Sequence, residues 1–309
     1  MGMSINWFPG HMNKAIREIK EILPKVDLVI EVLDARLPYS SSNPVIAKFC
    51  HDKPSLKLLT KSDLADPLIT EQWLAYFRQQ SQTQALAITT EKPEQIRALI
   101  GDIKQMLAGK EDKLGNLTAL ITGIPNVGKS TLINTLAGKQ IAKAANEPAV
   151  TQGQQRIDLR NGLILIDSPG ILWPKIENPK SGYRLALAGS IKNTAMNHED
   201  VACFGAEFFL KHYPELMKKR FKLVELPSHE VEFLEIIGKQ RGCLGSGGHV
   251  DFHKIATILL LEFRAAILGR ISLETPEVAM AEQQEVERIL AEKAAQKELD
   301  AQQKKKRKR

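Results

Sequence analysis

The chain has 309 residues, of which 43% are hydrophobic and 26% charged, which is typical of a globular protein with about two domains. These values exclude collagen-like, disordered and disulfide-scaffold chains, and no apolar run is long enough to span a bilayer. The net charge of +7 is concentrated in the last six residues, KKKRKR, so the remainder is nearly neutral. Three cysteines without a CxxC spacing favour a reducing compartment, and we expect a cytoplasmic monomer.

The first part of the chain alternates short apolar runs with helical patterns. Strands are predicted at residues 27–33, 55–59, 85–88, 118–122 and 163–167. Helices are predicted from Asp66–Pro67, over residues 93–108, and from Lys129 to Gly138. This alternation predicts an α/β fold with a mostly parallel sheet.

The strand signals fade after Pro179, and residues 181–272 are predicted to be mostly helical. The most apolar segment, residues 255–268, contains Glu262 and Arg264, which favours a core helix over a membrane span. A further helix is expected to begin at Thr275–Pro276 and to run into the basic tail. We therefore expect an α/β domain over residues 1–180, a smaller helical domain over 181–275, and an exposed helix with a tail over 276–309.

The strongest motif is GIPNVGKS, Gly123–Ser130, which matches GxxxxGK[ST] between a predicted strand and a predicted helix. Its backbone amides and the helix N-terminus would surround phosphates. Lys129 would contact the β- and γ-phosphates, and Ser130 would ligate Mg²⁺. The structural alternative, a glycine-rich turn before a helix, is disfavoured by this context. The residues expected around the nucleotide phosphates are Asn126, Val127, Gly128, Lys129, Ser130 and Thr131.

A second motif, Asp167-Ser-Pro-Gly170, comes after the strand over 163–167 and resembles the DxPG magnesium and switch motif of GTPases. Asp167 would hold Mg²⁺, mostly through water, and the Gly170 amide would sense the γ-phosphate. Thr151, between the two motifs, is placed where a switch threonine would close over the metal. A threonine in a polar loop is commonplace, so only its position supports this role.

A third motif, Thr60-Lys-Ser-Asp63, comes after the strand over 55–59 and resembles the guanine-reading NKxD motif. The Asp63 carboxylate can accept from two guanine N–H groups, which adenine cannot supply, so an ATPase is disfavoured. Lys61 would lie along the base, and Thr60 replaces the usual asparagine. An aspartate-containing turn after a strand is the alternative. Thr89 stands where GTPases have a Ser-Ala loop, although this match is poor.

The motif order is permuted, because the guanine motif precedes the phosphate loop. In ordinary GTPases the phosphate loop comes first. A circular permutation keeps the same sheet if residues 109–116, GKEDKLGN, bridge the former termini at the surface. The chain then passes from the switch motif directly into the helical part, so phosphate loss at Gly170 can move the helical part.

This order, together with WFPGHM at residues 7–12 and DSPGILWP at residues 167–174, resembles the YlqF, or ribosome biogenesis GTPase A, family of circularly permuted GTPases. The resemblance covers nearly the whole chain. It implies a permuted Ras-like domain, a helical domain that contacts ribosomal RNA, Mg²⁺ as cofactor, and the large ribosomal subunit as partner. It also implies GTP hydrolysis at a low basal rate that the subunit stimulates.

Two catalytic questions stay open from the sequence. Ile171 stands where Ras-like enzymes have a water-orienting glutamine, and the resemblance suggests His11 for that role. The alternative is that His11 caps a helix beginning near Met12. Asn126 resembles the asparagine of potassium-dependent GTPases, in which K⁺ supplies the charge of an arginine finger. The alternative is that Asn126 only favours a turn.

The leading hypothesis is a GTPase that docks on immature large subunits in its GTP state. The alternative is a nucleotide-dependent adaptor for RNA or a membrane surface, with negligible turnover. The tail suits phosphate-rich partners through counterion release, or is merely a solvated end. Four basic residues of the helical part are candidates for RNA contacts or an ordinary solvated face: Lys218, Lys219, Arg220 and Arg241.

Overall fold

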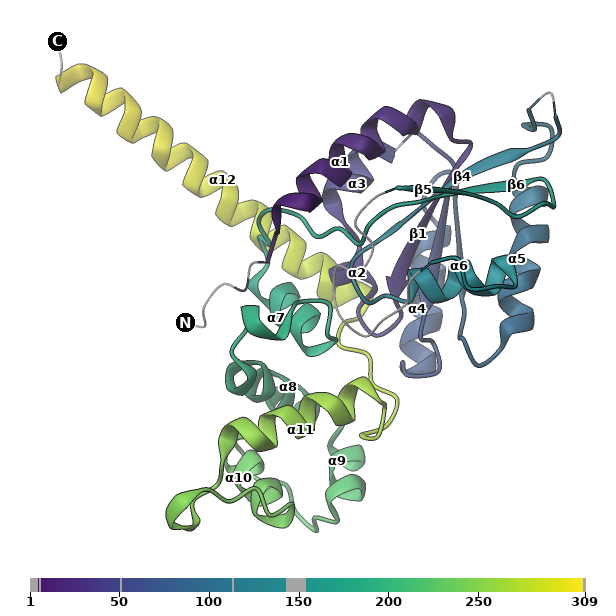
Figure 1. Cartoon of the computed structure of the whole chain (residues 1–309). Helices are drawn as coiled ribbons and strands as arrows, with labels where there is room; N and C mark the ends of the chain where they lie inside the picture. Colours follow the sequence, from purple (N-terminus) through teal and green to yellow (C-terminus); the bar gives the residue numbers. More distant parts are fainter. Residues whose placement is uncertain (1–4, 6, 51, 113, 143–153, 308–309) are drawn as a thin grey trace.

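A computed structural model describes residues 5, 7–50, 52–112, 114–142 and 154–307 (Figure 1). Its centre is a six-stranded sheet with the order β3-β2-β1-β4-β6-β5. The strands are β1 (Leu28–Asp34), β2 (Ser55–Thr60), β3 (Thr83–Ala87), β4 (Leu117–Gly123), β5 (Gln155–Asp158) and β6 (Leu163–Asp167). All neighbours are parallel except β5 and β6, which confirms the predicted α/β class.

The prediction missed β5, the edge strand. Its sequence, QRID, buries Ile157 alone among its four residues, so it carries no apolar run. Each of the seven residues of β1 is buried, as is each residue of β6. Such strands, covered on both faces, are apolar almost throughout and can be recognised from sequence.

Helices connect the strands and continue beyond them. Those within the sheet region are α1 (Gly10–Ile22), α2 (Pro38–Ser41), α3 (Pro44–Cys50), α4 (Pro67–Arg78), α5 (Pro93–Met106) and α6 (Lys129–Ala137). Those that come after β6 are α7 (Pro179–Leu187), α8 (His198–His212), α9 (Pro214–Phe221), α10 (Glu230–Gln240), α11 (Phe252–Arg264) and α12 (Pro276–Arg307). Three short 3-10 turns are η1 (Leu23–Lys25), η2 (Asn193–Ala195) and η3 (Ser246–Gly248).

Several helices begin or end at residues that cap them. Asp66 caps α4 by accepting from the amide of Leu68 at 2.9 Å, and Pro67 takes the first helical position, as predicted. Asp251 caps α11 by accepting from the amide of Lys254 at 3.0 Å. Gly138 ends α6 with a φ of 64°, a conformation that favours glycine.

Helices α7, α9, α10 and α11 pack against α8, and the five helices form a helical body beside the sheet (Figure 1). The rings of Phe209 on α8 and Phe263 on α11 stack with centroids 5.5 Å apart. Helix α11 is the core helix expected from the apolar run, because Leu259, Leu260 and Phe263 are buried. The proposed domain boundaries at 180 and 275 lie next to the starts of α7 and α12 and remain predictions.

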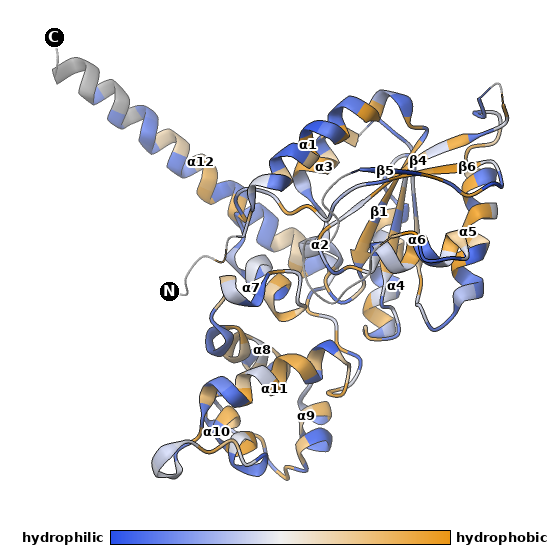
Figure 2. Ribbon diagram, in the orientation of Figure 1, coloured by the Kyte–Doolittle hydropathy of each residue, from blue (hydrophilic) through white to orange (hydrophobic). Residues whose placement is uncertain are grey.

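Helix α12 projects away from the rest of the chain (Figure 1). Figure 2 shows hydrophobic residues concentrated on the strands, whereas α12 is largely hydrophilic. Its first turn is anchored, since Ala279 is buried and Thr275 accepts from the amide of Val278 at 3.2 Å. Across the described residues, no helix combines the length and the apolar character that crossing a bilayer requires.

Candidate nucleotide site

The phosphate loop connects β4 to α6, as the motif predicts. A Cβ on Gly123 would lie 2.6 Å from the carbonyl oxygen of Val32 on β1, so only glycine fits there. Gly128 precedes α6 with a φ of 91°, a left-handed conformation that side chains rarely adopt. Lys129, Ser130 and Thr131 form the first turn of α6, whose free amides suit an anion.

The DSPG loop is docked against the phosphate loop. The amide of Ile171 donates to the carbonyl of Gly123 at 3.1 Å. A Cβ on Gly170 would lie 2.9 Å from Cα of Pro125, so this glycine permits the close approach. Ile171 is buried and apolar, consistent with its having no part in orienting water. The two motifs that sequence analysis assigns to phosphate and metal therefore lie in direct contact.

The carboxylate of Asp167 is placed to hold a cation. Its Oδ1 pairs with Nζ of Lys129, while its Oδ2 is buried and has no hydrogen-bond partner among the described residues. Burial raises the pKa of Asp167, and the charge of Lys129 opposes this. The oxygens of Asp167 and Ser130 are hard donors of the kind Mg²⁺ prefers, so these residues fit that ion. Thr151, the third expected ligand, lies outside the described residues.

The TKSD loop, residues 60–63, is joined to the phosphate loop by two side chains. The Thr60 hydroxyl oxygen lies 2.9 Å from the carbonyl of Leu33 and 2.5 Å from that of Val127. Thr60 thus bonds the phosphate loop although it replaces the asparagine of the usual motif. Nζ of Lys61 donates to the carbonyl of Asn126 at 2.7 Å.

Nζ of Lys61 also donates to a residue that sequence analysis missed, the buried Asp34 at the end of β1, over 2.9 Å. Asp34 belongs to no nucleotide motif. The one available signal was an aspartate that ends a buried apolar strand beside an arginine, Arg36.

The remaining guanine-side residues gather at the same sheet edge. The amide of Ser62 donates to the carbonyl of Ile88 at 3.3 Å, which brings the TKSD loop beside the loop of Thr89. Thr89 is buried, and its hydroxyl accepts from the amide of Glu91 at 3.2 Å. Asp63, in the TKSD loop, is half-buried. Because the carboxyl ends of parallel strands meet at one edge, all three motifs converge there.

The segment that follows α11 is hydrogen-bonded to the TKSD loop, a contact that the sequence did not predict. The Arg270 guanidinium donates to the carbonyls of Ser62 and Ala65, each at 2.9 Å. The amide of Ile271 donates to the carbonyl of Leu64 at 3.2 Å. The segment after α11 therefore returns to the nucleotide edge.

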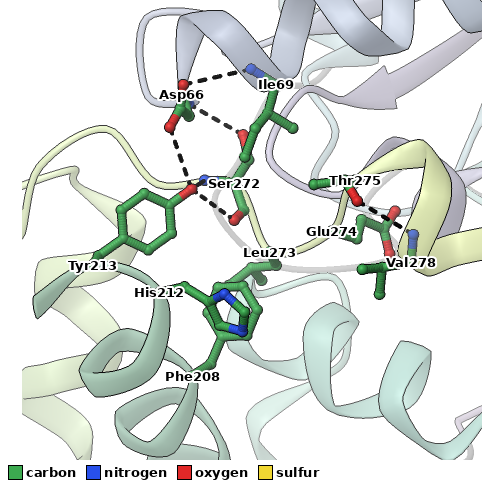
Figure 3. A pocket seen from close by; sticks show the side chains of 10 residues that line it. All are labelled: Asp66, Ile69, Phe208, His212, Tyr213, Ser272, Leu273, Glu274, Thr275 and Val278. Atoms are coloured by element: carbon green, nitrogen blue, oxygen red, sulfur yellow. Dashed lines mark hydrogen bonds between the residues drawn. The ribbon is translucent and has the colours of Figure 1, made fainter.

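Figure 3 shows further hydrogen bonds of the segment that follows α11. The amide of Asp66 donates to the hydroxyl of Ser272 at 3.1 Å, and the Tyr213 hydroxyl donates to the carbonyl of Ser272 at 3.1 Å. A cavity of about 210 Å³ lies beside them, with the rings of Phe208 and His212 on its wall.

His11 lies inside the first turn of α1, which begins at Gly10, so the capping alternative is wrong. The N-cap is Pro9, whose ring has no hydrogen-bonding group. His11 Nε2 is buried and has no hydrogen-bond partner within the described ranges. The neighbouring Met12 sulfur accepts from the amide of Leu172 at 3.4 Å, which places this turn against the DSPG loop.

Asn126 adopts a φ of 62°, as a turn-favouring residue would. Its side-chain Nδ2 donates to the carbonyl of Gly189, just beyond α7, at 2.7 Å. The turn interpretation is thus supported, and the potassium role of Asn126 stays a prediction.

Two of the four basic candidates for RNA contact have structural partners. The guanidinium groups of Arg220 and Arg241 both pair with the buried carboxylate of Glu262, at 2.5 and 2.8 Å. Lys218 pairs with Glu215 at 2.9 Å on the surface. Lys219 is exposed and remains a candidate.

The phosphate loop after β4, the DSPG loop after β6 and the TKSD loop after β2 define a P-loop GTPase fold with circularly permuted strand order. A family model described as 50S ribosome-binding GTPase matches residues 118–236, beginning at β4 and excluding the TKSD loop. The chain belongs to the ribosome biogenesis GTPase A family, because members of that family resemble it over nearly its whole length.

Ribosome biogenesis GTPase A of Priestia megaterium is 45% identical over 285 residues, covering 90% of this chain and 99% of that protein. The Thermotoga maritima protein of the same name is 32% identical, covering 91% and 98%. The GNP-bound crystal structure of YlqF from T. maritima matches with a TM-score of 0.60 at 30% identity, covering 86% of this chain and 99% of that one. A GDP-bound YlqF structure matches with a TM-score of 0.61 at 28% identity, covering 84% and 100%.

Proposed function

We propose that this protein binds GTP with Mg²⁺ and hydrolyses it to GDP and phosphate during assembly of the large ribosomal subunit. The observation that carries the proposal is the convergence of the phosphate, DSPG and TKSD loops at one sheet edge. Family membership supports the ribosomal setting. The alternative, an adaptor with negligible turnover, is not favoured by relatives that are named GTPases.

Each loop has a distinct task in binding. The amides of residues 126–131 surround the phosphates, and Lys129 neutralises the β- and γ-phosphates. Asp63 accepts from guanine N–H groups, Lys61 lies along the base, and the Thr89 loop flanks it. Ser130 and Asp167 would hold Mg²⁺, with Thr151 as the expected third ligand, and the ion would supply positive charge to the phosphates.

His11 orients the attacking water. Its buried Nε2 without a described partner, and its place on the turn that packs against the DSPG loop, support this role. An imidazole can accept a proton from water at neutral pH, whereas the Ile171 side chain cannot.

A potassium ion near Asn126 would add positive charge beside the phosphates. The Asn126 side-chain amide donates to Gly189, and its Oδ1 is a carbonyl oxygen like those that coordinate K⁺ in channel filters. Comparing GTPase rates in matched potassium and sodium buffers tests this role. Equal rates, with and without ribosomal subunits, would exclude it.

Docking on the large subunit in the GTP state, and release after hydrolysis, completes the cycle. The contact of Gly170 with the phosphate loop supports it, because γ-phosphate loss acts directly on the segment that leads into α7. The decisive experiment measures GTPase rates with and without purified large subunits, and co-sedimentation with a GTP analogue or GDP. We expect stimulated turnover and retention with the analogue; absence of both would refute the ribosomal role.

A further inference from the structure

Asp34 lies in the middle of the nucleotide edge, although none of the three motifs contains it. It ends β1, and its side chain is fully buried. Its carboxylate accepts from the Arg36 guanidinium through Nε at 2.9 Å and Nη2 at 2.8 Å. The same carboxylate accepts from Nζ of Lys61 at 2.9 Å. The buried carboxylate of Asp34 is therefore paired with two cations, Arg36 of the core and Lys61 of the TKSD loop.

Lys61 needs such a partner more than most lysines. Its backbone φ is 56°, a conformation that is uncommon for side chains larger than glycine or asparagine. A lysine side chain has many rotamers, and holding one of them has an entropic cost. Burial lowers the pKa of Lys61 and the charge of Asp34 opposes this, so the carboxylate also helps keep the ammonium charged.

We infer that Asp34 is a positioning residue for guanine nucleotide binding, which holds Lys61 so that its stem lies along the base while its ammonium reaches the carbonyl of Asn126. This inference rests on the proposed role of Lys61. Asp34 does not touch the nucleotide; it acts through the lysine. Arg36 balances the charge of Asp34 within the core, where its guanidinium lies 4.9 Å from the ring centroid of Phe263.

The same strand offers a matched control. Glu31 on β1 is also buried and pairs with a lysine of β2, Lys57. Glu31 lies in the middle of the strand, opposite Lys57 in register, whereas Asp34 ends the strand opposite Thr60. Both carboxylates contribute to the fold, but only Asp34 contacts the guanine loop through its lysine.

The test uses equilibrium binding of fluorescent GDP and of a non-hydrolysable GTP analogue to the full chain, below the melting temperature of every variant. Asp34→Asn alone would strand the buried cation of Arg36, so Asp34→Asn/Arg36→Met is compared with Arg36→Met. We expect the double variant to bind both nucleotides about tenfold more weakly than Arg36→Met, by the same factor for each, because Lys61 acts on the base side. Glu31→Gln should bind GDP like the parent.

A second arm repeats the comparison in a Lys61→Met background. With no lysine to position, removing Asp34 should change affinity by less than about twofold. A full additional loss in that background would overturn the inference, because Asp34 would then act on the fold. Equal affinity of the double variant and Arg36→Met would also overturn it, while leaving the proposed function intact. If Lys61→Met itself bound GDP like the parent, the proposed role of Lys61 would fail first.

Discussion

Lys61 donates its side-chain hydrogen bond to the carbonyl of Asn126, and both residues have positive φ, 56° and 62°. Two unusual backbone turns from different motifs thus support each other. The guanine loop and the phosphate loop form one unit at the sheet edge. A substitution that moves one loop should therefore displace the other.

Replacing Asp63 with asparagine should change the base preference. In the proposed site the Asp63 carboxylate accepts two hydrogen bonds from guanine, whereas an amide can accept one and must donate the other. We expect GDP affinity to fall on the order of a hundredfold and xanthosine diphosphate, which offers an acceptor there, to bind better than GDP. Competition binding measures this. Asp66→Asn, which keeps the cap of α4, is the control, and an unchanged guanine preference in Asp63→Asn would contradict the assignment.

Replacing His11 with alanine should slow GTP turnover about a hundredfold while GDP affinity changes by less than about twofold. The reason is that, in the proposed mechanism, the imidazole acts on water and not on the bound nucleotide. Single-turnover hydrolysis and nucleotide binding, measured side by side, separate the two effects. Asn13→Ala, on the exposed side of the same helix, controls for damage to α1. Parent-like turnover in His11→Ala would remove this residue from the mechanism.

Replacing Asp167 with asparagine should abolish the Mg²⁺ dependence of GTP binding. The variant keeps the shape of the site but loses the anionic oxygens, one of which is buried without a described partner. Titrating Mg²⁺ against a bound GTP analogue measures the change. Asp158→Asn, on the exposed face of β5, should titrate like the parent. A normal Mg²⁺ response in Asp167→Asn would assign the ion to other ligands.

Tyr213, which is hydrogen-bonded to Ser272, should make the free energy of unfolding sensitive to alkaline pH. Burial raises the pKa of Tyr213 from 10.0 to about 12; its hydrogen bond to Ser272 opposes this, and Asp66 adds to it. The unfolded chain then loses the proton first, so the stabilisation is complete below pH 10 and is lost as the pH rises towards 12.

The measurement is reversible unfolding of the parent and Tyr213→Phe between about pH 9 and pH 11. Because other titrations are common to both proteins, their difference in unfolding free energy isolates the phenol. That difference should shrink as the pH rises. A constant difference across the range would show that Tyr213 has an ordinary pKa.

Deleting Lys304–Arg309 should weaken ribosome association mainly at low salt and leave the intrinsic GTPase rate unchanged. A cluster of positive charge that reads no base edges attracts phosphates without setting the register of binding. The slope of affinity against salt should become shallower. A chain that ends in six serines instead serves as the control. Complete loss of subunit-stimulated hydrolysis at every salt concentration would make the tail a specific recognition element.

The features that could be predicted are those in which residue type and local geometry determine each other. Strand β6 is buried throughout, and its sequence is apolar from Leu163 up to the closing Asp167. Gly123 and Gly128 occupy places where a side chain would clash or strain the backbone, so the motif identifies the loop. Edge strand β5 buries one residue and leaves no such trace.

The features that could not be predicted depend on residues far apart in the chain. Asp34 gains its role only when the end of β1 lies beside Lys61, and an aspartate at a strand end has no motif of its own. Arg220 and Arg241 resemble surface cations until the fold places Glu262 of α11 between them. Likewise, the sequence around Arg270 carries no pattern that predicts its hydrogen bonds to the TKSD loop.

The helical body meets the nucleotide edge at several separate points. The carbonyl of Gly189 accepts from the Asn126 side chain of the phosphate loop. Arg270 donates to carbonyls at the TKSD loop, and Phe263 of α11 lies against the Arg36 guanidinium just beyond β1. A partner that displaced these helices would therefore pull on the phosphate loop and the TKSD loop together, and its load would reach both ends of the candidate site at once.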